Sequence, residues 1–186
     1  MIKSQPSLKL TYQDFLELQA DGKGRELIDG DLHVTPAATT RHQAVLLNLL
    51  RVLGNFVHQG RVGVLLPPLT DVLLSPVDVV HPDALFVGGD RLELIKENHV
   101  AGAPDLAIEI LSPASRRIDA RIKLRLYERH GVQEYWIVDP ELETIEVYCL
   151  AQGAYQRIAE LALERREVLT SPLFPGLSIP LLDVFD

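Results

Sequence analysis

The sequence predicts an α/β fold in which helices flank a mixed central β-sheet. The main evidence is the order strand, helix, strand between residues 106 and 139, because a crossover of this kind joins parallel strands. Turn signals on both sides of this unit predict hairpins, which add antiparallel strands. The length of 186 residues fits one domain, 1–186, and no repeat, low-complexity tract or Gly/Ser linker marks a boundary.

The first half of the chain begins with a short helix and a hairpin. Thr11 and Asp14 form a capping-box pattern, with Asp in the Glu position, which starts a helix to about Ala20. The segment RELIDGDLHV then predicts two strands joined at Asp29-Gly30. The spacing of apolar residues predicts a long helix from Thr40 to about Gln59. Between turns that contain Pro and Asp we expect three strands: Val62–Leu66, Thr70–Leu74 and Ala84–Val87.

The second half contains the crossover unit. We expect a strand at Leu106–Leu111, a break at Ser112–Ser115 and a helix that ends at Gly131. Three apolar residues at helical spacing predict the buried side of that helix: Ile118, Ile122 and Leu126.

The strands after this helix complete the sheet. Glu134–Asp139 and Thr144–Leu150 predict a hairpin around Pro140-Glu141. Two shorter strands, near Tyr155–Ala159 and Val168–Thr170, are expected to complete the edge of the same sheet.

The composition is that of a soluble globular protein, with 47% apolar and 24% charged residues. No apolar run approaches the roughly 18 residues of a membrane helix, and the amino terminus lacks the features of a signal peptide. We therefore expect a cytoplasmic protein without membrane contact. The single cysteine, Cys149, excludes an internal disulfide framework and a multi-cysteine metal site.

The charges are unevenly distributed along the chain. A net charge of −8 argues mildly against a protein that simply coats nucleic acid, since such proteins usually carry a basic excess. Six of the 18 Lys and Arg residues nevertheless lie in one stretch and predict a local basic face: Arg116, Arg117, Arg121, Lys123, Arg125 and Arg129.

Two carboxylates stand out because of their apolar neighbours. Glu109 lies in the middle of a strand, where a buried carboxylate needs a counter-charge or a metal. Its pattern leaves two interpretations open, an ion pair with a neighbouring Arg or contact with a cation. Asp83 follows Pro82 and precedes a strand, so it is either a turn residue or a ligand. Pro104-Asp105 is the same dipeptide, and there the turn interpretation is stronger.

Asp83 and Glu109 on adjacent strands could together bind one hard divalent cation. Mg²⁺ is typically held by one or two carboxylates plus waters and substrate phosphate, and it can activate water for attack on phosphorus. A lysine beside the metal would orient that water. Leu111 cannot serve, whereas Lys123 could reach the site from the following helix. The alternative for Lys123 is a surface lysine paired with Asp119, four residues earlier.

The run PDLAIEILSPASRRIDARIKLRLYERHGVQEYWIVDP resembles the signature of the Uma-two family of restriction endonucleases, part of the PD-(D/E)xK nuclease superfamily. Further matches are ELIDGDL near the start, His42 at the start of the long helix, HPDALFV, and FPGLSIPLLDVF at the end. The resemblance covers most of the chain. It implies a restriction-endonuclease-like fold with a mixed central sheet flanked by helices.

The resemblance also implies a role for each candidate residue. Asp83 would be the motif aspartate, Glu109 the (D/E) position, and the backbone carbonyl of Ile110 a further metal contact. Lys123 would replace the lysine that usually lies two residues after the acid, a displacement that this family shares. Glu26 would be an outer contact to the metal or its water.

Other candidates are interpreted as structural. His42 is a helix-start or hydrogen-bonding residue rather than a ligand, and Tyr135 and Trp136 are core residues rather than a base-stacking platform. Ser112 and Ser115 lack a nucleophile motif, and the sequence has no phosphate-binding Gly-rich loop.

The predicted function is Mg²⁺- or Mn²⁺-dependent hydrolysis of nucleic-acid phosphodiester bonds by an endonuclease, with DNA as the expected substrate. Two alternatives stay open: a binding or regulatory module that retains the fold, and a hydrolase of another phosphoester. The resemblance further suggests a homodimer, because nucleases of this fold commonly pair so that two sites address two strands.

Overall fold

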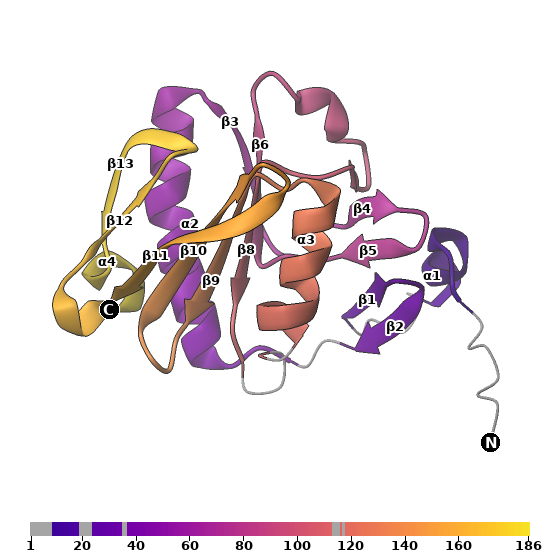
Figure 1. Cartoon of the computed structure of the whole chain (residues 1–186), viewed down its shortest axis with the longest axis horizontal. Helices are drawn as coiled ribbons and strands as arrows, with labels where there is room; N and C mark the ends of the chain where they lie inside the picture. The colour runs from indigo at the N-terminus through magenta and orange to yellow at the C-terminus, as the bar shows by residue number, and fades with distance from the viewer. Residues whose placement is uncertain (1–8, 19–23, 35–36, 113–115, 117) are drawn as a thin grey trace.

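The structure is a computed structural model that describes residues 9–18, 24–34, 37–112, 116 and 118–186. A mixed sheet of six strands forms its centre, in the order β11-β10-β9-β8-β6-β3 (Figure 1). Strands β8 and β9 are parallel, and the other neighbouring pairs are antiparallel. The bounds are β3 Gly63–Leu66, β6 Ala84–Gly88, β8 Leu106–Ile110, β9 Glu134–Asp139, β10 Thr144–Ala151 and β11 Ala154–Ala162.

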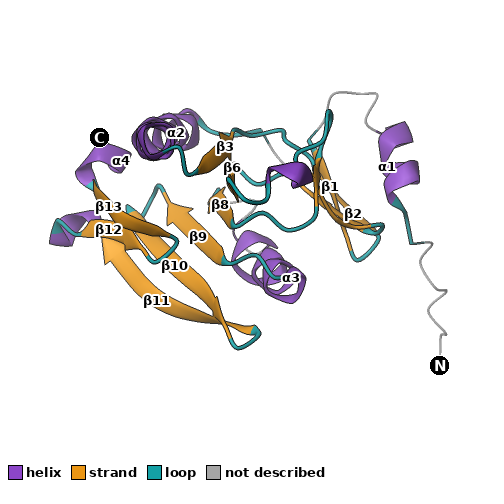
Figure 2. Ribbon diagram, turned by 90° about the horizontal axis from the view of Figure 1, so that it is seen from above, coloured by secondary structure: helices purple, strands orange, loops and turns teal. Residues whose placement is uncertain are grey.

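Two helices cover the two faces of this sheet, as Figure 2 shows from above. Helix α2 (Thr40–Gly60) lies on one face, and its first turn is capped by the Thr39 hydroxyl, which accepts a hydrogen bond from the His42 N–H. Helix α3 (Leu124–His130) lies on the other face and continues directly from a π-helical segment, Ile118–Lys123. It ends at Gly131, whose φ of 82° gives the left-handed conformation of a helix C-cap.

Strand β8 contributes to the core on both faces, because successive side chains of a strand point in opposite directions. Leu106, Ile108 and Ile110 pack in the layer that contains α2. Ala107 and Leu111 pack in the layer that contains α3. Glu109 lies between these last two positions and therefore on the α3 face.

A second sheet of five strands, in the order β2-β1-β5-β4-β7, lies next to the central one (Figures 1 and 2). Its first hairpin turns at Asp29-Gly30, with φ values of 51° and 74° that suit the two-residue turn expected from the sequence. Helix α1 (Tyr12–Leu18) packs Phe15 against this sheet. The strand bounds are β1 Arg25–Ile28, β2 Asp31–Val34, β4 Val72–Ser75, β5 Asp78–Val80 and β7 Val100–Ala101.

The carboxyl-terminal part forms a separate hairpin, β12 (Val168–Ser171) with β13 (Phe174–Pro180), followed by the short helix α4 (Leu182–Phe185). The expectation that residues 168–170 complete the edge of the central sheet is wrong, because β12 pairs with β13 and β11 forms that edge. The physical reason is Phe174, whose ring packs on Phe86 with centroids 4.8 Å apart. The hairpin thus closes the core on the α2 face instead of lengthening the sheet.

The α/β class, the long helix and the parallel crossover are confirmed. A second difference from expectation is that the hairpin at residues 25–34 and the strand near residue 72 belong to the second sheet. Among the helices that the structure describes, none combines the length and the apolar character that crossing a membrane requires.

Candidate active site at the margin of the central sheet

Asp83 and Glu109 are brought together by the antiparallel pairing of β6 and β8. The register pairs Ala84 with Ile108, so Asp83 lies next to Glu109 at the end of the pair. Oδ2 of Asp83 accepts a hydrogen bond of 2.7 Å from the Ile110 N–H. In an extended strand the N–H and C=O of one residue point to the same side, so the Ile110 carbonyl also faces the Asp83 side of β8.

The second contact of Asp83 comes from helix α2. Nε2 of His42 lies 3.3 Å from Oδ2 of Asp83, and the Asp83 side chain remains 20% exposed. The imidazole of His42 thus contacts the carboxylate of Asp83, while the backbone N–H of His42 takes part in the helix cap. Because α2 begins at Thr40, its first turn is what places the imidazole at this margin of the sheet.

Glu109 is buried, with 3% of its surface exposed. Its Oε1 lies 2.9 Å from Nζ of Lys123 and accepts a hydrogen bond of 2.8 Å from the hydroxyl of Tyr127. Lys123 from the helical segment therefore supplies a counter-charge for Glu109. The surface alternative for Lys123 does not hold, since Lys123 itself is 3% exposed; the side chain of Asp119 lies outside the described part.

Glu26 from strand β1 completes this buried group. Its Oε1 lies 2.8 Å from Nζ of Lys123 and accepts a hydrogen bond of 2.8 Å from the His81 N–H. Glu26, Lys123 and Glu109 thus form a chain of charges that joins the second sheet, the helical segment and the central sheet. Breaking such a buried group by removing one partner typically costs about 3–5 kcal/mol, because the remaining charge stays buried.

The helix directs Lys123 and Tyr127 toward the same carboxylate. Residues four apart lie on one helix face, so Lys123 and Tyr127 can both reach Oε1 of Glu109. Leu126 lies on the same buried side, and Ile122 is only partly buried. The sequence interpretation missed Tyr127, although its spacing of four residues from Lys123 was a usable signal.

Asp78 fixes the second sheet to the end of helix α3. Its carboxylate lies 2.9 Å from Nη2 of Arg129 and 3.2 Å from Nε2 of His130. It also accepts hydrogen bonds of 2.7 Å from the Asp29 N–H and from the Ser75 hydroxyl. Burial alone raises the pKa of Asp78, but these hydrogen bonds and the charge of Arg129 together hold that pKa below its usual range. This contact helps to place the hairpin that carries Glu26 against the helix that follows Lys123.

The oxygen donors at this margin suit a hard divalent cation. Asp83, Glu109 and the Ile110 carbonyl supply carboxylate and carbonyl oxygens, the ligand types that Mg²⁺ takes. Within the described residues, no three His, Cys, Asp or Glu side chains are grouped so as to enclose a metal ion by themselves. Mg²⁺ typically needs only one or two protein carboxylates, with waters and phosphate oxygens in the other positions. The donor set therefore fits an open site that substrate would complete.

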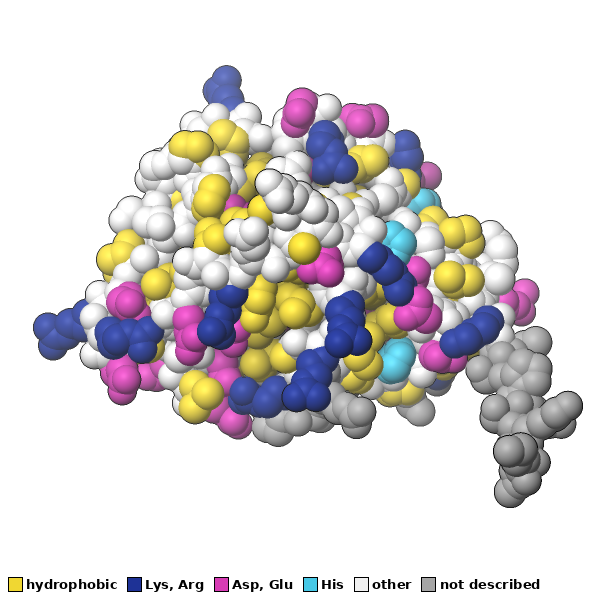
Figure 3. Space-filling model, viewed as in Figure 1, with side chains coloured by type: hydrophobic (Ala, Val, Ile, Leu, Met, Phe, Trp, Pro, Cys, Tyr) yellow, Lys and Arg dark blue, Asp and Glu magenta, His cyan; other side chains and the backbone are white. Residues whose placement is uncertain are grey.

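A groove of about 650 Å³ lies on the α3 face of the central sheet, and its lining includes residues that neighbour Glu109 but none of the predicted site residues. Its apolar floor includes Leu111 and Ile137, and Ile137 is the β9 residue in register with Glu109. Arg116 and Arg121 line the groove on the helical side, and acidic residues of β9–β11 line the opposite side. Figure 3 shows blue Lys and Arg side chains beside an apolar hollow on this face.

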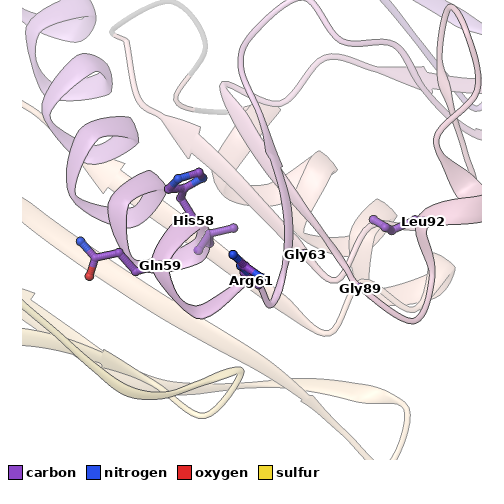
Figure 4. A pocket seen from close by; sticks show the side chains of 7 residues that line it. His58, Gln59, Arg61, Gly63, Gly89 and Leu92 are labelled. Carbon is purple, nitrogen blue, oxygen red and sulfur yellow. The ribbon is translucent and has the colours of Figure 1, made fainter.

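A second pocket, of about 620 Å³, lies at the other end of helix α2 (Figure 4). It is lined by His58, Gln59, Arg61 and neighbouring glycines, and it contains none of the predicted site residues. A helix of 21 residues is on the order of 30 Å long, so this pocket is far from His42 and Asp83.

The β6–β8 pair places Asp83 next to Glu109, and Glu109 contacts Lys123 from the helical segment that precedes α3. The chain belongs to the Uma2 family, whose model matches residues 12–184 and is described as "Putative restriction endonuclease". A solved structure with a similar fold is that of "a putative nuclease belonging to DUF820" from Anabaena variabilis. The two chains are 23% identical, with a TM-score of 0.78, and the match covers 95% of this chain and 97% of the other. A search of curated proteins gave no match.

Proposed function

We propose that this protein is a Mg²⁺- or Mn²⁺-dependent nuclease that cleaves phosphodiester bonds within nucleic acid, with DNA as its substrate. The observation that carries the proposal is the contact of buried Glu109 with Lys123, next to the partly exposed Asp83. Membership of the Uma2 family supports a nuclease-like activity. The metal and the substrate are inferred from the chemistry of the donors.

Each residue has a distinct role in this proposal. Asp83, Glu109 and the carbonyl of Ile110 would hold the metal, which when bound supplies positive charge at the phosphate and lowers the pKa of a bound water. Lys123 places an ammonium group beside Glu109, where it orients the attacking water and offsets charge that develops on the phosphate. Glu26 would be an outer contact to the metal or its water, and its contact of 2.8 Å with Nζ of Lys123 holds that side chain in place.

In this proposal the substrate lies along the groove whose floor includes Ile137, the β9 residue in register with Glu109. Arg121 and Arg125 are exposed on the face of the helical segment and α3, where they can contact phosphates. The net charge of −8 opposes long-range attraction, so binding is weak and falls steeply with salt. We further propose that the protein acts as a homodimer, so that two such sites address the two strands of a duplex.

A second candidate is a binding or regulatory module that retains the fold without cleavage. The observation that favours it is the engagement of Lys123 by two glutamates, which is also what a purely structural ion group would show. A hydrolase of small phosphodiesters would use the same donors. The nuclease and these two alternatives predict different results in the experiment below.

The test compares Glu109→Gln with Glu134→Gln on supercoiled plasmid and on single-stranded DNA and RNA, each with Mg²⁺ or Mn²⁺. Glu134 is a matched control, because it is also a buried strand glutamate but bonds Trp136 and Ser171. We expect Glu109→Gln to lower the rate on the order of 100- to 1,000-fold, since the metal site loses a charged ligand. Glu134→Gln should retain the rate per folded molecule.

Three outcomes would count against the proposal. Wild-type protein that cleaves none of these nucleic acids with either metal would favour the binding module. Cleavage of bis(4-nitrophenyl) phosphate without cleavage of nucleic acid would favour the small-substrate hydrolase. Equal rates for Glu109→Gln and wild type would place the reaction elsewhere in the chain.

A further inference from the structure

We propose that Tyr127 is a positioning residue that fixes Glu109 for metal binding. Its hydroxyl donates a hydrogen bond of 2.8 Å to Oε1 of Glu109, and both side chains are buried. The inference rests on the proposed function in one respect, namely that Glu109 contacts a divalent cation. It adds a residue outside the acid and lysine set to the machinery of the site.

The ring of Tyr127 is held in place by a cluster of tyrosines. Tyr127 packs on Tyr135 with ring centroids 4.9 Å apart, and Tyr135 stacks on Tyr155 at 6.3 Å with an interplanar angle of 24°. Tyr148 contacts the rings of Tyr135 and Tyr155. Since Tyr127 and Tyr135 are 0% exposed, the phenol cannot swing away from Glu109 without disturbing the packing between α3 and the sheet.

The two donors on Oε1 determine how the carboxylate is oriented. Lys123 and Tyr127 both contact this oxygen, at 2.9 and 2.8 Å. Rotation of the carboxylate would break at least one of these contacts, so the directions of both oxygens of Glu109 are fixed. Partners behind a metal ligand commonly set its orientation in this way.

The chemistry of a phenol suits this position beside a cation. A second lysine would add positive charge and so oppose the arrival of a divalent ion, whereas the hydroxyl of Tyr127 is a neutral donor. The network therefore divides two tasks. Lys123 supplies the positive charge, and Tyr127 supplies direction without further charge.

The experiment compares Tyr127→Phe with Tyr155→Phe, using Mn²⁺ alone as the probe. Tyr155→Phe is a matched control, because it removes a hydroxyl from the same aromatic cluster, one that donates to the Val132 carbonyl at 2.9 Å. Mn²⁺ binding is measured by electron paramagnetic resonance of the free ion. We expect Tyr127→Phe to weaken Mn²⁺ binding about 10- to 100-fold, the usual effect of losing such a partner, and Tyr155→Phe to bind like wild type.

A second measurement covers the case in which Tyr127→Phe is less stable than wild type. The rise in unfolding free energy on addition of Mn²⁺ depends on the dissociation constant of the folded state, so it reports metal affinity even when the metal-free stability has changed. We expect this rise to be smaller in Tyr127→Phe than in Tyr155→Phe and wild type. A merely structural tyrosine would lower metal-free stability and leave the Mn²⁺-dependent rise unchanged.

The outcomes separate this inference from the proposed function. Equal Mn²⁺ affinity in Tyr127→Phe and wild type overturns the role of Tyr127 and leaves the nuclease proposal standing. Weakened Mn²⁺ binding in Tyr127→Phe, with no cleavage of nucleic acid by wild type, supports Tyr127 and refutes the nuclease. Wild type that binds no Mn²⁺ overturns both.

Discussion

Two Pro-Asp dipeptides begin neighbouring strands of the central sheet, and their aspartates have different surroundings. Asp83 precedes β6 and Asp105 precedes β8, so in this antiparallel pair they lie at opposite ends. Asp105 is buried and bonds through both oxygens: Oδ2 accepts from the Gly88 N–H, and Oδ1 accepts from Gln133 and Arg91. Its donors come from two parts of the chain, residues 88–91 and Gln133.

Among the described residues, Asp83 is contacted through Oδ2 alone. This oxygen accepts a hydrogen bond from the Ile110 N–H and lies near Nε2 of His42. Its side chain is 20% exposed, against 5% for Asp105. An aspartate whose two oxygens are both used by protein donors stabilises the fold, while one that keeps solvent access beside a buried glutamate can take a ligand. The same dipeptide thus has a structural use at one end of the strand pair and a candidate chemical use at the other.

The largest expected effect that tests this contrast is on cleavage by Asp83→Asn. The amide keeps an oxygen that can accept from the Ile110 N–H but removes a charged oxygen from the proposed metal site. We expect the cleavage rate to fall on the order of 100- to 1,000-fold, with a change in unfolding free energy of less than about 1 kcal/mol. The measurements are plasmid cleavage with Mn²⁺ and urea denaturation. Asp105→Asn is the control, and the contrast fails if that variant loses cleavage to the same extent per folded molecule.

The second largest expected effect is a decrease in the unfolding free energy caused by Asp105→Asn. In Asp105→Asn an NH₂ group replaces one carboxylate oxygen. This group faces hydrogen-bond donors and cannot accept from them. We expect the unfolding free energy to decrease by about 2 kcal/mol, the usual cost of leaving buried hydrogen-bonding groups without their partners. Urea denaturation monitored by the fluorescence of Trp136 measures this change. An Asp105→Asn protein as stable as wild type would show that the saturated aspartate has no structural role.

The elements that the sequence predicted well are those with local signals. Thr11 bonds Asp14 through both its N–H and its hydroxyl, and the Asp29-Gly30 turn has the expected left-handed conformation. The assignment of strands to sheets was harder, because it depends on contacts between distant segments. Phe174 is one example, since its packing on Phe86 directs the last hairpin to the α2 face. No local sequence pattern predicts that contact.

The site shows the same division between local and distant information. A glutamate inside the apolar strand at residues 106–110 indicated that a partner must exist, but the sequence placed Lys123 beside a metal and did not predict its direct contact with Glu109. Glu26 could only be suggested by resemblance, because its contact with Lys123 joins a strand of the second sheet to a helical segment 97 positions later in the chain. The π-helical segment at Ile118–Lys123 could not be predicted from the sequence either, because the apolar spacing there fits an ordinary α-helix equally well.

The smallest expected effect concerns the basic side of the groove. Arg121 and Arg125 are exposed on the face that carries α3, and each is expected to contact one phosphate of the substrate. Arg121→Gln and Arg125→Gln should each weaken DNA binding a few-fold and make the plot of log affinity against log salt shallower by about one. Fluorescence anisotropy between 20 and 200 mM salt, roughly the range in which such contacts dominate, measures both quantities. Arg51→Gln is the control, because Arg51 is exposed on α2, on the opposite face of the central sheet (Figure 2). If all three variants lower the slope equally, DNA is held by the overall charge of the protein, and the groove beside Glu109 has no special part in binding.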